Sequence, residues 1–194
     1  MYYLLKHLAT NMSETKEFLY QSITDTQATI KAIDVKLGFL FVLAFMPLTL
    51  LSTITPCISN LWKFGLLFQI MLIINFIAWF LSLIYLFFSL TSISDPNDHI
   101  SGPRPAGLFY GKNLFKTENI NLFSTIKITC NYTVDNLFSA LPSGDEIIRE
   151  LAYEKIKITY IREIKISYYA RSTKLILTWL CLGLILYITS SIMK

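Results

Sequence analysis

The sequence predicts an all-α integral membrane protein, with three transmembrane helices and helical cytoplasmic stalks that form a small cytoplasmic bundle. Three apolar runs without a charged residue carry this prediction, at residues 37–54, 64–90 and 175–193. The 194-residue chain is 54% hydrophobic and only 15% charged, and its mean hydropathy is +0.51. A helix needs about 20 residues to cross about 30 Å of hydrocarbon, so the runs match the thickness of a bilayer.

Residues 1–36 are expected to form a cytoplasmic N-terminal helix. Asn11 and Glu14 fit a capping box, which predicts that this helix begins near Ser13. Seven residues then keep an unbroken 4-3 spacing, which is typical of a seam that packs against other helices. They are Leu19, Ile23, Thr26, Ile30, Ile33, Leu37 and Leu40. The helix is expected to run directly into the first transmembrane helix at residues 37–54.

The next two segments are predicted as an outer tip, residues 55–63, and a second transmembrane helix, residues 64–92. Pro47 is expected to kink the first span, and the second span is long enough to tilt or protrude. Small and weakly polar residues share one face of the second span: Asn75, Ala78, Ser82, Tyr85 and Ser89. Such a face either packs helices together or lines a wet path. The candidate path residues are Gln69, Asn75 and Ser82.

Residues 93–174 are predicted to form a cytoplasmic helical region. Its first part, residues 94–113, is a linker because repeated proline and glycine interrupt helices and strands. This linker combines basic and aromatic side chains, which suit either a nucleotide or an anchor at the membrane interface. The candidate ligand-binding residues are Arg104, Phe109, Tyr110 and Lys112, together with Lys165 further along the chain.

Residues 118–141 are predicted to be a helix, although the alternation at residues 126–132 also fits a strand. Ser143 and Glu146 form a capping box, so a long helix is expected to follow. That helix continues into the third transmembrane helix at residues 175–193. Its apolar side is interrupted by Glu154 and Lys165, and the stretch KIKITY has the composition of a strand. The two stalks are expected to pair with each other and with the helix that begins at Glu118.

The distribution of basic residues predicts the orientation. Eleven of the seventeen lysines and arginines lie within residues 94–174, whereas the connection at residues 55–63 holds one. Cytoplasmic loops carry the excess of basic residues, so the N-terminus and residues 93–174 are expected in the cytoplasm. The net charge of +4 is a topology signal, and we expect no nucleic-acid partner because nine acidic residues share the same segment.

The sequence motifs of catalysis are missing. The chain has no HExxH, no CxxC, no glycine-rich dinucleotide turn and no paired carboxylates in an apolar setting. We therefore expect a protein that is not an enzyme, with no catalytic residue, no metal site and no cofactor. The spans also lack the buried carboxylates that proton pumps and ion-coupled carriers use.

Three short segments, in this order and spacing, carry a family resemblance. They are Ile33-Asp34-Val35-Lys36 at the entry to the first span, Leu108-Phe109-Tyr110-Gly111 after the proline-bearing loop, and residues 150–174 before the last span. With this layout the chain resembles the Pycsar transmembrane effector family of bacterial anti-phage proteins. The positions that match the family are Asp34, Lys36 and Gly111.

The resemblance implies an anti-phage defence effector that responds to a cyclic nucleotide second messenger. A neighbouring cyclase would make a cyclic pyrimidine nucleotide, cyclic UMP (cUMP) or cyclic CMP (cCMP), on infection. The effector, as a homo-oligomer in the bacterial inner membrane, would then impair that membrane and cause abortive infection. The chain departs from a known sensor in having no segment that reads as a cyclic-nucleotide β-roll. The alternative is a non-enzymatic membrane scaffold subunit that docks a soluble partner through its stalks.

Overall fold

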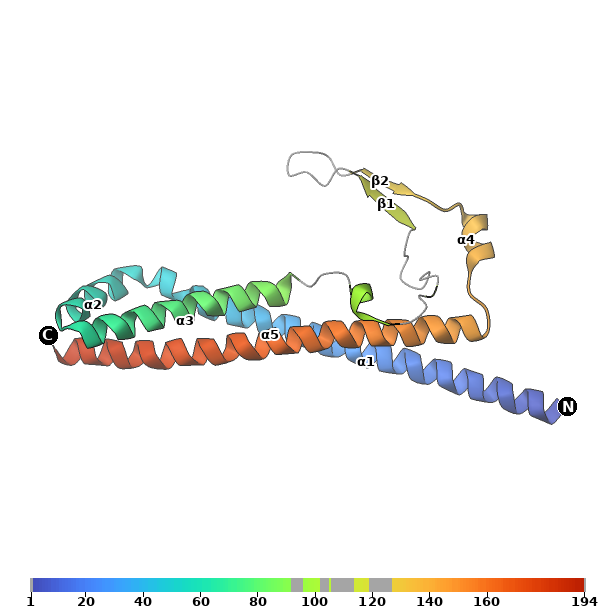
Figure 1. Ribbon diagram of the computed structural model, residues 1–194, viewed down its shortest axis with the longest axis horizontal. Helices are drawn as coiled ribbons and strands as arrows, with labels where there is room; N and C mark the ends of the chain where they lie inside the picture. The colour runs from blue at the N-terminus through green and yellow to red at the C-terminus, as the bar shows by residue number, and fades with distance from the viewer. Residues whose placement is uncertain (1, 92–95, 102–104, 106–113, 119–126, 194) are drawn as a thin grey trace. The chain divides into compact units, whose positions relative to one another are not determined.

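The computed structural model of the protein describes residues 2–91, 96–101, 105, 114–118 and 127–193 (Figure 1). Long helices dominate these residues. The chain divides into two compact units, which are described separately. The first unit comprises Met1–Thr26 and Asp95–Thr159, and the second unit comprises Gln27–Ser94 and Tyr160–Lys194. Two helices, α1 and α5, contribute residues to both units.

Helix α1 spans Tyr2–Thr49 and therefore begins earlier than the sequence predicted. The expected start near Ser13 is wrong, because the capping-box residue Asn11 lies inside a continuous helix. The chain has no proline or glycine before Gly38, so no helix-breaking residue interrupts α1 near Ser13. The predicted 4-3 seam is confirmed as the buried side of α1, since each of its seven residues is buried or half-buried.

Helix α1 ends two residues after Pro47, and helix α2 occupies Leu51–Lys63. The kink expected at Pro47 takes the form of this helix break, in which the N–H of Leu50 donates to the carbonyl of Pro47 at 3.2 Å. Residues 55–63 are thus helical. The chain turns at Gly65, whose φ of 119° lies in a region that side chains with a Cβ rarely adopt.

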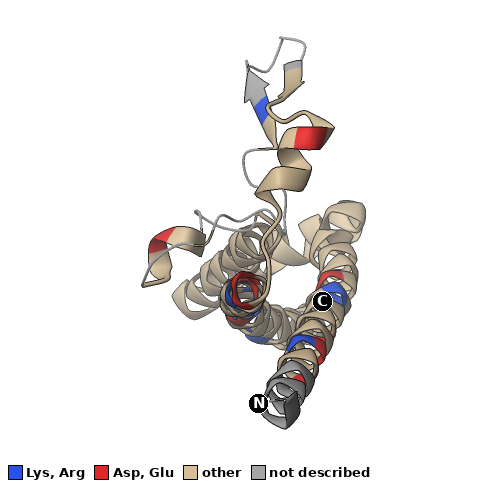
Figure 2. Ribbon diagram, turned by 90° about the vertical axis from the view of Figure 1, so that its right-hand side faces the viewer, with Lys and Arg blue, Asp and Glu red and all other residues tan. Residues whose placement is uncertain are grey.

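Helix α3 spans Leu66–Leu90 and contains no charged residue. Helix α5 spans Asp145–Ile192, so the long helix predicted after Ser143 is confirmed, including the stretch KIKITY. Half of the predicted capping box is present, because the Ser143 N–H donates to Glu146 Oε2 at 3.1 Å. Charged residues lie on parts of α1 and α5 and on the short elements between α3 and α5, whereas most of the long ribbons is uncharged (Figure 2).

The segment between α3 and α5 departs most from the prediction. It contains a 3-10 turn at Pro96–His99, strands β1 (Phe115–Glu118) and β2 (Lys127–Cys130), and a short helix α4 (Val134–Ala140). The two strands pair antiparallel, with Phe115 opposite Cys130. The helix predicted over residues 118–141 is therefore wrong at β2, where the alternation of side chains prevailed over helix propensity. Among its described residues, only the last part, α4, is helical, with Thr133 as the N-cap.

The first unit has a small apolar cluster between α1 and α5. It consists of Ile23, Leu151 and Ile158, with Leu19 and Ile147 packed against it. The pairing of the two stalks is thus confirmed. The predicted third member of a cytoplasmic bundle, the helix from Glu118, is replaced by the hairpin over the described residues.

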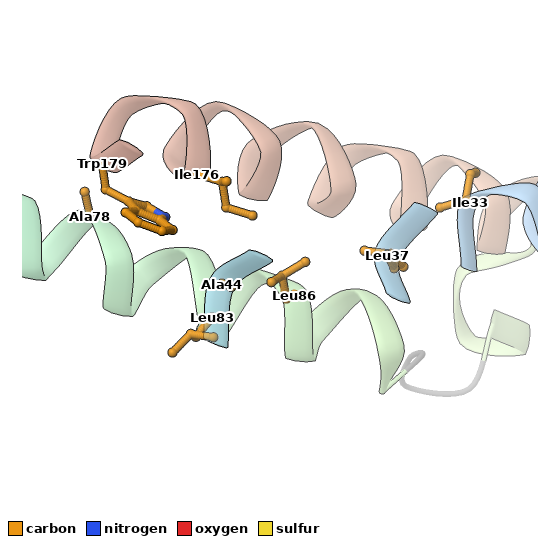
Figure 3. Packing of buried hydrophobic residues seen from close by; sticks show 8 residues of the cluster. All are labelled: Ile33, Leu37, Ala44, Ala78, Leu83, Leu86, Ile176 and Trp179. Carbon is orange, nitrogen blue, oxygen red and sulfur yellow. The ribbon is translucent and has the colours of Figure 1, made fainter. Parts of the chain in front are cut away.

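The second unit contains the larger core, in which α1, α3 and α5 pack together (Figure 3). Helix α1 supplies Ile33, Leu37 and Ala44, helix α3 supplies Ala78, Leu83 and Leu86, and helix α5 supplies Ile176 and Trp179. Large apolar side chains also cover the outside, such as Phe39, Val42 and Leu66, each more than 70% exposed. An apolar exterior of this extent suits lipid rather than water.

Helices α1, α3 and α5 are each long and apolar enough to cross a membrane, which confirms the three spanning helices that the sequence predicted. The protein is therefore membrane-embedded.

Candidate functional site

An ion pair joins α1 to α5 in the second unit. Lys165 Nζ donates to Asp34 Oδ1 at 2.5 Å, and their side chains are 10% and 41% exposed. Lysine is almost never so buried unless it has a partner. Lys165 lies on the same side of α5 as Ile158, two helical turns away, which explains why this residue interrupts the apolar side in the sequence. The carboxylate of Asp34 is the group that makes this burial possible.

Helix α3 contacts α5 beside this ion pair. Ser89, which is fully buried, donates through Oγ to the backbone carbonyl of Lys165 at 3.5 Å. Tyr168 lies one turn further along α5, and its ring centroid is 6.1 Å from Tyr85 and 5.7 Å from Phe88 on α3. We call Asp34, Lys165, Ser89, Tyr85, Tyr168 and Arg171 the polar layer.

The last member of the polar layer is Arg171, whose Cζ lies 5.9 Å from the centroid of the Tyr85 ring. Basic and aromatic side chains of this kind gather where a helix leaves the hydrocarbon, because both present an apolar body and a polar tip. Chemically, the layer can hold three helices in one arrangement through charge and ring contacts.

A second polar cluster lies in the first unit. Lys155 Nζ donates to the Ser22 carbonyl at 3.0 Å and to Thr26 Oγ1 at 2.7 Å, so α5 is bonded to α1 there as well. Glu154, one residue earlier, is 4% exposed and forms a salt bridge with Lys157 at 3.2 Å. Burial raises the pKa of the Glu154 carboxyl above its ordinary value of 4.5, and the neighbouring ammonium of Lys157 only partly opposes this.

The three predicted path residues, Gln69, Asn75 and Ser82, make contacts with different helices or turns. Ser82 is fully buried and donates through Oγ to the carbonyl of Trp79 at 2.7 Å. Asn75 lies against α5, where a Cβ added to Gly183 would be 3.5 Å from its Nδ2. Gln69 is half-buried and donates through Nε2 to the carbonyl of Trp62 on α2 at 2.9 Å. Asn75 and Ser82 therefore face the interior of the three-helix core.

Most of the predicted ligand-binding residues lie outside the described residues. They are Arg104, Phe109, Tyr110 and Lys112, and the motif position Gly111 lies outside with them. Of the motif positions that are described, Lys36 is exposed on α1, whereas Asp34 belongs to the polar layer. The structure thus brings together Asp34 and Lys165, which the sequence had singled out for unrelated reasons.

Sequence reasoning missed two polar contacts. Trp79 Nε1 donates to the carbonyl of Ala44 at 2.7 Å and so joins α3 to α1. Arg171 was counted only among the eleven basic residues within residues 94–174. The residue types themselves were a signal. A buried tryptophan N–H usually finds a hydrogen-bond acceptor. An arginine among aromatic residues often lies over the face of a ring.

The comparisons identify no relative. Neither the protein-family models, nor the curated proteins, nor the solved structures contain a match to this chain. Within the part of the chain that the structure describes, no three His, Cys, Asp or Glu side chains gather in a way that could hold a metal ion. The class defined by the fold is a small membrane-embedded protein in which three of the described helices are long and apolar enough to span a membrane.

Proposed function

We propose that the protein is an anti-phage defence effector that responds to a cyclic nucleotide and impairs the bacterial inner membrane. The observation that carries the proposal is the Asp34–Lys165 pair, a polar contact between the two helices that run unbroken from the first unit into the apolar core. Because α1 and α5 are each continuous from the first unit into the apolar core, a movement of either helix in the first unit can be transmitted to the core. The family resemblance supplies the biological setting.

The proposed trigger is the entry of an anionic messenger. Arg104, Phe109, Tyr110 and Lys112 are the proposed contacts for its base and phosphate, and Lys165 is a further cation within reach of a rearranged stalk. A phosphate that draws Lys165 away from Asp34 weakens the contact that holds α1 to α5. The messenger has this effect only if it binds the open state better than the closed one. Inverting a 1:99 population needs a preference of about 10⁴-fold.

The proposed response is a leak along the polar face of α3. Asn75 and Ser82 face the interior of the core, and Gln69 holds α3 to α2. Within one chain this face is covered by the core, so a path needs α3 and α5 to separate. We propose that copies of the chain associate as a homo-oligomer and that the separated helices of neighbouring copies line the path. The N-terminus and residues 93–174 lie on the cytoplasmic side, where the messenger is made.

The scaffold alternative receives less support. It needs the seam of α1 to be available for a soluble partner, yet Leu19, Ile23 and Thr26 are covered within the chain, and Lys155 bonds to the same helix. The leak and the scaffold predict different toxicity, because only the leak makes the protein toxic when the messenger is present and no soluble partner is docked.

The experiment is a measurement of membrane potential with a voltage-sensitive dye in bacteria that express the protein. Cyclic UMP, cyclic CMP and cyclic oligonucleotides are generated one at a time. We expect depolarisation with one messenger and none with the others, and we expect it to be lost when Asn75 and Ser82 are both replaced by alanine at equal expression. Normal potential with every messenger, despite full membrane insertion, would contradict the proposal.

A further inference from the structure

Two basic side chains of α5, Arg171 and Lys174, have no acidic partner among the described residues. Both are exposed, and since they are three residues apart they are neighbours on one face of the helix. The second unit contains two acids, Asp34 and Glu163, and each of these already pairs with another basic residue. Two adjacent positive charges are therefore left without compensation inside the unit.

These two charges lie further into the apolar part of the unit than the Asp34–Lys165 pair. Along α5, Arg171 is about 9 Å and Lys174 about 14 Å past Lys165, in the direction of the apolar run of that helix. Helices α1 and α5 run in the same direction through the core (Figure 1). Distances past the ion pair can therefore be compared between the two helices.

At a similar depth the neighbouring helices expose apolar side chains. On α1, Phe39 and Val42 lie about 8 and 12 Å past Asp34. On α3, Phe88 lies beside Tyr168, one turn nearer to the ion pair than the two charges. All three apolar side chains are half exposed or more. Water at this level would wet them, whereas hydrocarbon would leave two charges unpaired. The boundary where phosphate groups meet acyl chains suits both kinds of side chain.

The ring of Tyr85 fixes one of the two charges beside α3. The Cζ atom of Arg171 lies 5.9 Å from the centroid of this ring, and the ring itself is 6.1 Å from that of Tyr168. The contact supplies no acceptor oxygen, so the guanidinium can still bind a phosphate through two parallel N–H···O bonds. Lys174 adds a second charge one turn further along α5, and an ammonium binds phosphate as a point charge.

We propose that Arg171 and Lys174 form a binding site for the headgroup phosphate of an anionic phospholipid. The acyl chains of this lipid lie along the apolar side chains further into the membrane, such as Leu177 on α5 and Leu81 on α3, both of which are exposed. Leu177 is three residues past Lys174 and so shares its face of the helix. The site is independent of the nucleotide response proposed above, since it uses none of the residues assigned to the messenger.

The test compares two phospholipids that have the same acyl chains and differ in net charge. The purified full-length protein in micelles of a nonionic detergent is titrated with dioleoylphosphatidylglycerol and with dioleoylphosphatidylcholine, and bound lipids are counted by native mass spectrometry. We expect the first phosphatidylglycerol to bind about 30-fold more tightly than the first phosphatidylcholine. This is the combined effect of two basic side chains, each of which contributes about fivefold at an anionic membrane surface.

Two double variants separate the site from the net charge of the protein. Arg171→Gln with Lys174→Gln removes both proposed contacts and is expected to bring the two lipids close to equal binding. Lys31→Gln with Lys36→Gln is the matched control, because it removes two exposed charges from α1 near Asp34 and is expected to keep most of the preference. If both double variants lose the preference equally, overall charge attracts the lipid and the proposal is overturned.

Measurements on the native chain alone keep the proposal open to refutation if a variant does not fold. Inorganic phosphate and cyclic UMP, each in large excess, are expected to leave phosphatidylglycerol bound, because neither has acyl chains to lie along the helices. Displacement by either would show that the site takes a soluble anion, and equal binding of the two lipids would show that it takes no anionic headgroup. Each of these results would overturn the proposal, whereas a silent response to every messenger would not affect it.

Discussion

The two partners of the Asp34–Lys165 pair should differ in how much the fold depends on them. The Lys165 side chain is 10% exposed, whereas that of Asp34 is 41% exposed. Replacing Asp34 by alanine leaves an ammonium group buried and unpaired. Replacing Lys165 by methionine leaves a carboxylate that water still reaches, and the methionine keeps most of the buried stem. Asp34→Ala is therefore the more damaging change.

The size of the difference follows from the exposed fractions. Removing one partner of a fully buried pair costs about 3–5 kcal/mol, whereas an exposed pair contributes about 0–1 kcal/mol. The pair is buried on one side only, so we expect about 2–3 kcal/mol for Asp34→Ala and under about 1 kcal/mol for Lys165→Met. The double variant removes the buried charge and is expected to resemble Lys165→Met.

The assay is equilibrium unfolding of the four proteins in detergent micelles, followed by far-ultraviolet circular dichroism. Lys36→Met is the control, since Lys36 is an exposed lysine on the same helix and its replacement is expected to change the free energy of unfolding by less than ~0.5 kcal/mol. If Lys165→Met destabilises the protein as much as Asp34→Ala, the difference in burial does not govern the pair and the reasoning is refuted.

Three further predictions concern the first unit, each measured as a melting temperature or free energy of unfolding in micelles. Leu151→Ala removes a fully buried side chain and is expected to cost about 2–5 kcal/mol; a loss under ~1 kcal/mol would mean that α1 and α5 do not pack there. Glu154→Gln is expected to stabilise the protein at neutral pH. Because the pKa of Glu154 is raised on folding, the contribution of this group to stability is complete below pH 4.5 and is lost as pH rises towards the raised value, and the variant should lack this part of the pH dependence. Glu146→Ala removes the bond to the Ser143 N–H and is expected to cost about 0.5–2 kcal/mol, with amide exchange accelerated only in the first turn of α5.

The parts of the fold that were predictable from the sequence are those with a repeated spacing. The seam of α1 recurs every three or four residues over six turns, and each of its members is buried or half-buried in the structure. For α5, the composition of KIKITY favoured a strand, yet the periodic apolar side around it and the preceding capping box favoured a helix. Over a segment of this length, periodicity outweighs local propensity.

The hairpin was harder to predict because its strands are four residues long and give the period-2 pattern little room. Within the polar layer, the sequence identified both Asp34 and Lys165 but not their pairing. A lysine in an apolar stripe is itself a sign of a buried acid nearby, but several acids of the chain satisfy that condition. Only the packing of α1 on α5 selects Asp34. No sequence pattern predicted the cavity lined by α2, α3 and α5, because its shape depends on where α1 ends.

The most direct test of the central proposal is ion flux through liposomes that contain only the purified protein. The vesicles enclose a potassium-sensitive dye, and cyclic UMP, cyclic CMP or a cyclic oligonucleotide is added outside to protein with its first unit facing out. We predict flux with one messenger, lost in a variant with Asn75 and Ser82 both replaced by alanine. Intact vesicles with every messenger, from protein that is folded and correctly oriented, would contradict the account.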